Sequence, residues 1–148
     1  MKTSKSNTPL IKMYAVSTLF AAILLLSSCG TSKYTFYTSS VVPAAEGTVK
    51  VKKDGNSNYK ISMDIIRLAE PQRLNPSKAM YVVWMETEQN GRKNIGQLKT
   101  SSSLLSKTLK SSLSTVSSLK PTGFFITAED DASIQYPAGE VVLRTGAN

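Results

Sequence analysis

Few residues of this chain have the types and spacing needed for chemistry. The acidic run Glu129-Asp130-Asp131, with Glu140 further along, offers the hard carboxylate oxygens that Ca²⁺ prefers. Ser117-Ser-Leu-Lys120 has the Ser-x-x-Lys spacing of hydrolases that use a lysine base, but nine of the eighteen residues from 101 to 118 are serine, so chance explains the match. The chain has no His and one Cys, which excludes a His-based relay, a Cys/His zinc site and a disulfide within one chain.

Neither of the two candidate metal sites has a strong pattern. Consecutive acids point to alternate sides of an extended chain, so residues 129–131 would converge on one ion only in a tight loop. Met63, Met80 and Met85 suggest a copper(I) thioether site, although Met63 and Met85 fall in apolar segments typical of a core. No glycine-rich phosphate loop is present. We therefore predict a protein that is not an enzyme and has no cofactor, with Ca²⁺ or small-ligand binding by Glu129, Asp130 and Asp131 as the alternative.

The single cysteine follows a segment typical of a secretory signal. The apolar stretch from 13 to 26 has 14 residues, and no acid occurs before Glu46. At about 1.5 Å per residue a helix of that length falls short of a hydrocarbon core roughly 30 Å thick. Positive charge precedes the stretch, at Lys2, Lys5 and Lys12. This combination predicts a signal peptide over residues 1–28.

Leu26-Ser27-Ser28-Cys29 resembles the lipobox of bacterial lipoproteins. The resemblance implies cleavage between Ser28 and Cys29, with Cys29 lipidated as the first mature residue. The alternatives are a plain secretory signal with a chance cysteine, or an uncleaved signal anchor. Each buried acyl CH₂ contributes about 0.8 kcal/mol, so the acyl chains of a lipoprotein would hold the protein on a membrane permanently.

The expected mature chain, residues 29–148, has 15 basic and 10 acidic residues, a net charge of +5. That balance favours an anionic membrane surface, and a secreted, anchored protein gives no reason to expect nucleic acid as a partner. Gly30 replaces the Asp that marks inner-membrane retention in enterobacterial lipoproteins, and no acidic export signal of the Bacteroidetes kind follows. We therefore expect the periplasmic face of the outer membrane and an envelope protein as partner.

From Glu46 onward the pattern is that of β-strands. Val49 and Val51 alternate with polar residues, Asp54-Gly55-Asn56 is a turn signal, and the segment 59–65 alternates again, which predicts a hairpin. The alternation slips at Ile66, where we expect a bulge or a strand end. The hairpin lysines are interpreted as a solvated edge that discourages strand addition, or as a lipid-facing patch: Lys50, Lys52, Lys53 and Lys60.

Further strands are expected at 79–85, 92–98, 124–128 and 140–144, separated by turns rich in Gly, Pro and Asn. We predict an all-β, antiparallel sandwich over residues 46–148, preceded by a lipidated N-terminus and tether over 29–45 that holds a short strand or an anchor-proximal contact at 34–38. The predicted core residues are Tyr81, Trp84, Phe125, Val141 and Leu143.

The Ser-rich segment 101–118 is open to two interpretations. Leu105, Leu109 and Leu113 have a spacing compatible with a helix, but they also share one parity along a strand. Because Ser and Thr are poor helix formers, we favour a strand with loops over a helix or an unstructured linker.

Two stretches together resemble the extracytoplasmic C-terminal domain of anti-sigma-K factors. They are Tyr81-Val-Val-Trp84 and, about forty residues on, Phe125-Ile-Thr-Ala-Glu129, followed by Ser133, Pro137 and Val141-Val-Leu143. The resemblance spans about residues 47 to 146 and implies an immunoglobulin-like β-sandwich without catalytic residues. Asp130-Asp131-Ala132 departs from the small, Gly-rich residues of the family, and residues 96–120 are longer and richer in Ser. No counterpart of the sigma-binding helical module is recognised, so sigma-factor inhibition is not expected.

Overall fold

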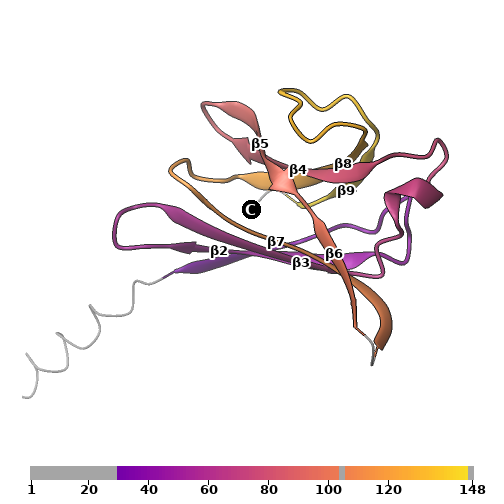
Figure 1. Ribbon diagram of the computed structural model, residues 1–148. Coiled ribbons are helices and arrows are strands. Elements are labelled where there is room, and N and C mark those ends of the chain that lie inside the picture. Colours follow the sequence, from indigo (N-terminus) through magenta and orange to yellow (C-terminus); the bar gives the residue numbers. More distant parts are fainter. Residues whose placement is uncertain (1–29, 104–105, 147–148) are drawn as a thin grey trace, which may run out of the picture. The chain divides into compact units, whose positions relative to one another are not determined.

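Two antiparallel β-sheets make up the part of the chain that the computed structural model describes, residues 30–103 and 106–146 (Figure 1). The predicted all-β class and sandwich arrangement are confirmed. The predicted signal peptide, with its cleavage site at Ser28 and lipidation at Cys29, lies outside the described residues. Within those residues, no helix has the length and apolar character needed to cross a bilayer.

The first sheet has five strands in the order β1-β2-β3-β7-β6. Its central hairpin is the predicted one, because Val49 lies opposite Met63 and Val51 opposite Ile61. The Asp54 carboxylate accepts hydrogen bonds from the backbone N–H groups of Asn56 and Asn58, both at 2.9 Å, and so closes the turn. The strands of this sheet are β1 Thr31–Thr35, β2 Glu46–Lys53, β3 Tyr59–Ile66, β6 Lys99–Ser103 and β7 Ser106–Ser117.

The second sheet has four strands in the order β5-β4-β8-β9. A loop with a short 3₁₀ helix, η1 Pro71–Arg73, leads into it from β3. The chain leaves β3 where the slip was expected, since the strand ends at Ile66 and Arg67 takes a positive φ of 58°. The strands of this sheet are β4 Met80–Thr87, β5 Gly91–Gln97, β8 Gly123–Glu129 and β9 Val141–Arg144.

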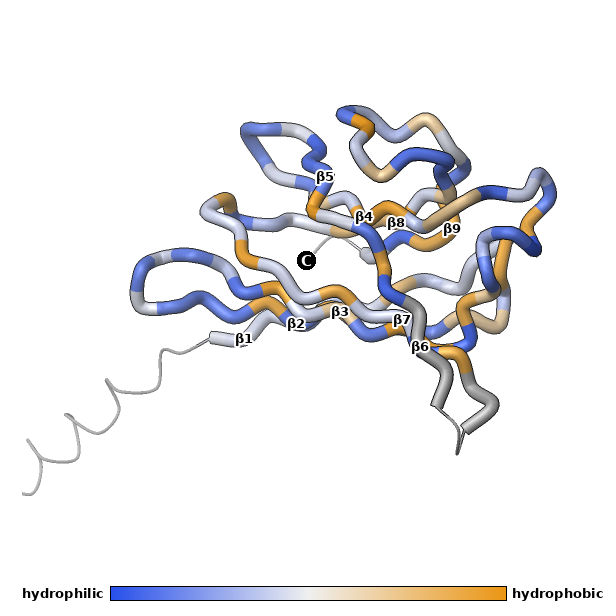
Figure 2. Tube along the Cα trace, viewed as in Figure 1, coloured by the Kyte–Doolittle hydropathy of each residue, from blue (hydrophilic) through white to orange (hydrophobic). Residues whose placement is uncertain are grey.

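The main hydrophobic core lies between the two sheets, where Figure 2 shows hydrophobic residues along the facing strands. Tyr34 of β1 packs edge-on against Phe124 of β8, with ring centroids 5.2 Å apart. Tyr81 is buried as predicted and donates a 2.9 Å hydrogen bond to the Ala69 carbonyl. Burial raises the pKa of the Tyr81 phenol to about 12.

The predicted tether over 29–45 is, from Thr31 onward, part of the sandwich. β1 pairs with β2 along its whole length, and Phe36 forms a β-bridge with Thr145 beside the other sheet. The buried Ser39 hydroxyl donates a 2.6 Å hydrogen bond to the Val142 carbonyl. The stretch was interpreted as a tether because it lies between Cys29 and the strand pattern that begins at Glu46, but its pairing with β2 and the bond from Ser39 make it part of the fold.

The Ser-rich segment forms strands β6 and β7, as the favoured interpretation predicted. Ser111 is buried and Leu113 half-buried on the inner side, while Ser112 and Ser114 are exposed on the outer side. This strand changes one prediction about the lysine-bearing hairpin. Because β7 pairs with β3 and β1 pairs with β2, neither hairpin strand is a sheet edge, and the interpretation of the lysines as edge protection is wrong.

Candidate functional site

The four-stranded sheet buries a second, smaller cluster on its outer face. Trp84 and Phe125 are buried as predicted, but they belong to this cluster and not to the core between the sheets. Their neighbours Val83 and Ile126 point the other way, into the main core. The two aromatic rings stack with centroids 6.0 Å apart. Met80 and Ile134 cover the cluster.

Two arginines lie against the outer surface of Phe125. The guanidinium carbon of Arg144 is 4.7 Å from the ring centroid, and that of Arg92 is 5.7 Å away, both within cation–π range. Arg144 also pairs with Glu86 at 2.8 Å. The edge of the aromatic cluster therefore carries two guanidinium groups, one of which is paired with a carboxylate.

Val141 was predicted to be a core residue, and the structure contradicts this. Its exposed fraction is 40%, whereas Val142 and Leu143 are buried. The pairing of β9 with β8 shifts register between Ile126 and Thr127, and such an irregularity changes which side chains face inward. Leu143 is in the core as predicted.

The outer cluster is covered by residues 130–140, here called the cap loop, which connect β8 to β9 and lie above the four-stranded sheet in Figure 1. A buried polar chain fixes the end of this loop. The Trp84 indole N–H donates to the Thr127 hydroxyl at 2.8 Å, and that hydroxyl donates to Oε1 of Glu129 at 2.7 Å. The same carboxylate oxygen accepts the backbone N–H groups of Ala138 at 3.1 Å and Gly139 at 2.9 Å.

Glycine is needed at the point where the cap loop returns to the sheet. A Cβ on Gly139 would collide with the Ala128 carbonyl oxygen and approach the Glu129 carboxylate to 3.0 Å. The loop backbone therefore lies directly on β8, with Glu129 buried beneath it at 3% exposure.

Polar contacts also hold the outer part of the cap loop. The Asn94 side-chain amide donates to the carbonyls of Ala132 at 2.9 Å and Ile134 at 3.0 Å. Asp130 pairs with Lys78 at 2.7 Å, and this hydrogen bond lowers the pKa of the carboxyl. Asp131 accepts the Ser133 backbone N–H at 2.8 Å, and this bond lowers the pKa of Asp131.

The three acids suggested as a Ca²⁺ site do not converge. Glu129 is buried beneath the loop, Asp130 is directed to Lys78 and Asp131 is directed to Ser133. Across residues 30–103 and 106–146, no group of three or more potential ligands is arranged to hold a metal ion. The acidic run serves to order the cap loop instead.

A groove of about 800 Å³ runs between the cap loop and the β4–β5 turn. Polar and cationic side chains line the groove, with Arg92 and Lys93 on one wall and Gln135 on the other. Tyr136 stands at this groove with 81% of its surface exposed. We call this feature the tyrosine groove: residues 90–94 and 132–136. A cationic wall and an exposed phenol suit an acidic or polar protein surface.

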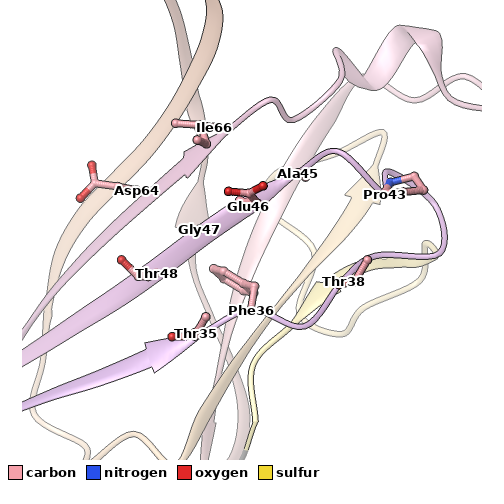
Figure 3. Close-up of a pocket in the computed structure, with 10 residues that line it drawn as sticks. All are labelled: Thr35, Phe36, Thr38, Pro43, Ala45, Glu46, Gly47, Thr48, Asp64 and Ile66. Carbon is pink, nitrogen blue, oxygen red and sulfur yellow. The ribbon is translucent and has the colours of Figure 1, made fainter.

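A second hollow, of about 450 Å³, lies near the end of β1 (Figure 3). Figure 3 shows its lining coming from the end of β1, the start of β2, the end of β3 and the segment around Pro43. Glu46 lies on this wall and pairs with Arg67 at 2.9 Å, so the position is a paired surface acid.

The Ser-x-x-Lys match at Ser117 and Lys120 lies in a turn, and the hydrogen bonds of the Ser117 hydroxyl are made to Leu119. The Ser117 hydroxyl donates to the Leu119 carbonyl at 3.1 Å and accepts the Leu119 N–H at 3.0 Å. These bonds form a local turn at the end of β7.

The residues that hold the cap loop on the sheet were not predicted from the sequence. Asn94 was not singled out, and Thr127 entered only as one residue of the motif Phe125-Ile-Thr-Ala-Glu129, although each is a polar residue next to apolar strand positions. A buried hydroxyl or amide must find a partner, so such positions are a usable signal for loops that fold back on a sheet.

Comparisons with family profiles, with curated proteins and with solved structures found no match to this chain.

Proposed function

We propose that this protein is a lipid-anchored module of the bacterial cell envelope that binds another envelope protein and catalyses no reaction. Its β-sandwich is of the immunoglobulin-like class that the resemblance to anti-sigma-K factors implies. One observation carries the proposal: Gly30 alone separates the lone Cys29 of the lipobox-like segment from β1, which begins at Thr31. A thiol at that position would attach the folded domain directly to lipid.

The tyrosine groove is the surface best suited to the partner. It combines an exposed aromatic ring with two cations, and aromatic residues and Arg are enriched in protein interfaces. Hydrogen bonds hold the cap loop near its start, at Ala132, and near its end, at Gly139, so its binding surface is preorganised. We place the module on the periplasmic face of the outer membrane, with neither a cofactor nor nucleic acid as partner.

The anchor is tested by metabolic labelling with an alkyne fatty acid, followed by intact-mass analysis of the purified protein. Wild type should carry acyl groups and fractionate with membranes, and Cys29→Ser should lose both. A Cys29→Ser protein that matures normally and stays on membranes would overturn the lipoprotein assignment. Ser32→Cys in the Cys29→Ser background is a control for the position of the thiol.

The partner surface is tested by placing a photo-crosslinking amino acid at position 136 and, as a matched control, at Val116. Both side chains are exposed, at 81% and 58%, but Val116 lies on the five-stranded sheet. A discrete adduct with one envelope protein from position 136 and none from position 116 supports the proposal. Equal adducts from both positions would contradict it. Loss of the adduct in Arg92→Ala would add the groove wall to the contact.

A further inference from the structure

The outer face of the five-stranded sheet is a lysine-rich surface with no covering element among the described residues. Its lysines are all exposed and come from all five strands, and we call them the lysine face: Lys33, Lys50, Lys52, Lys60, Lys99 and Lys110. Many of the side chains between them are small and carry a hydroxyl group, among them Thr48, Ser62 and Ser114. The longer lysine side chains therefore extend beyond their neighbours.

Pairs of lysines on this face lie directly opposite one another across neighbouring strands. Lys33 is in register with Lys50, and Lys52 is in register with Lys60. Like charges in such positions are destabilising by a few tenths of a kcal/mol or more. None of the four ion pairs formed by described residues involves a lysine of this face. The lysines of this face are therefore not neutralised by ion pairs among the described residues.

The acids of this face are displaced toward one end. Asp64 is opposite Thr48, and Glu46 is opposite Ile66 and paired with Arg67. The lysine pairs occupy the other end, where Lys52 is opposite Thr31, the first residue of β1. The positive charge is thus densest at the end of the sheet where the chain enters the domain.

We propose that the lysine face lies on the anionic phospholipid headgroups of the membrane that holds the anchor. This inference rests on the proposed function, because Cys29 supplies the anchor. In the sequence only Gly30 separates Cys29 from Thr31, so an anchor on Cys29 would hold this end of the sheet close to the bilayer surface. The tyrosine groove, on the outer face of the other sheet, then points away from the lipid.

Charge complementarity selects this occupant over an apolar one. A lysine near an anionic bilayer improves partitioning by about fivefold, and the effect disappears beyond a Debye length or in high salt. Flexible lysine side chains surrounded by small residues can adapt to an uneven, mobile layer of lipid headgroups. A protein partner would instead need a defined apolar centre. On the described strands of this sheet, Val116 is the only large hydrophobic residue that is well exposed.

The test uses the purified, processed full-length protein in two kinds of vesicle, phosphatidylcholine alone and phosphatidylcholine with about one-third phosphatidylglycerol. An amine-acylating reagent is added, and labelling of each lysine is measured by mass spectrometry. In the anionic vesicles the lysine face should be labelled several-fold more slowly than Lys120, which lies in a loop outside it. In high salt, and in phosphatidylcholine alone, that difference should vanish. Equal labelling in the two vesicles would overturn the proposal, as would protection that persists without anionic lipid.

Matched variants separate the face from net charge. Lys50→Gln/Lys60→Gln should abolish the protection of Lys33 and Lys52, whereas Lys120→Gln/Arg73→Gln removes the same charge elsewhere and should leave it intact. Loss of protection in both variants would indicate a net-charge effect and overturn the docking face.

Mass analysis of the N-terminal peptide shows whether Cys29 is acylated, and so distinguishes failure of the lysine-face proposal from failure of the anchor. An acylated Cys29 with no protected lysines would refute the face alone. An unacylated protein whose lysine face is still protected on anionic vesicles would refute the anchor alone.

Discussion

The two outer faces of the sandwich solve the same problem in opposite ways. A sheet with one face in the core must either expose polar residues on its other face or cover it. The four-stranded sheet is covered: Trp84 and Phe125 lie there, sealed by the cap loop. The five-stranded sheet is left open and carries lysines and small hydroxyls. A single sandwich therefore presents one rigid, structured surface and one adaptable, charged surface.

Loop length accounts for much of this difference. Residues 54–58 connect β2 to β3 and only close the turn, whereas residues 130–140 connect β8 to β9 and extend over the sheet. A hairpin connection needs about two to five residues, so the cap loop is longer than its connection requires. The additional residues exclude water from the aromatic cluster and form one wall of the tyrosine groove.

The largest expected effect comes from truncating the covered face. Trp84→Ala should lower the free energy of unfolding by about 3–5 kcal/mol, since a fully buried aromatic side chain and its packing contacts are lost. Val116→Ala on the open face should change it by less than about 0.5 kcal/mol, because Val116 is 58% exposed. Urea unfolding measures both. Similar losses at the two positions would mean that the faces do not differ as described.

A smaller effect should follow from breaking the buried polar chain beneath the cap loop. Thr127→Val keeps the side-chain shape but leaves the Trp84 N–H without its acceptor and removes one donor from Glu129. We expect a loss of about 1–3 kcal/mol, with Thr127→Ser close to wild type because the hydroxyl is retained. Faster amide exchange at Ala138 and Gly139 would show that the loop is the part that loosens. Unchanged amide exchange at these two residues would show that the buried polar chain does not hold the cap loop.

The contrast between the faces also explains what the sequence could predict. Period-two alternation located the β2–β3 hairpin, and apolar runs located β4 and β8, because burial of a face imposes those patterns. The same patterns could not assign Trp84 and Phe125 to the outer cluster. A strand that is buried on both faces is apolar throughout, so its sequence does not indicate which face packs on the other sheet and which is covered by a loop.

Long-range contacts set the remaining limits. Nothing local in Glu129-Asp130-Asp131 predicts that one acid is buried under a glycine, another meets Lys78 and the third bonds Ser133. The inclusion of residues 31–45 in the sandwich depends on pairing with β2 and on the Ser39 hydroxyl bonding Val142. Val141 was misassigned because a register shift in β9 follows from its pairing and not from its composition.

On the open face we expect a substitution that stabilises the fold while weakening the proposed lipid contact. Lys52→Glu places an acid opposite Lys60 and should raise the free energy of unfolding by about 0.2–1 kcal/mol, because it replaces a like-charge pair with an opposite one. Lys120→Glu makes the same charge change outside the face and should not stabilise. Thermal unfolding at low and high salt checks both, and the gain should shrink in high salt. A Lys52→Glu protein less stable than wild type would show that the lysines of this face do not repel.

The smallest effect concerns the acid stability of the cap loop. The pKa values of Asp130 and Asp131 are lowered from 3.8, the first by the hydrogen bond from Lys78 and the second by bonds from Ser133. A carboxyl whose pKa is lower in the folded state contributes stability above its unfolded pKa, and that stability is lost as the pH falls through the folded value. The protein should therefore lose stability below about pH 4. Asp130→Asn/Asp131→Asn should be less stable at neutral pH, and its thermal midpoint should change less with pH below about pH 4 than that of wild type. Both carboxyls are exposed, so the change should be small, and a slope identical to wild type would mean that these bonds do not couple the loop to protonation.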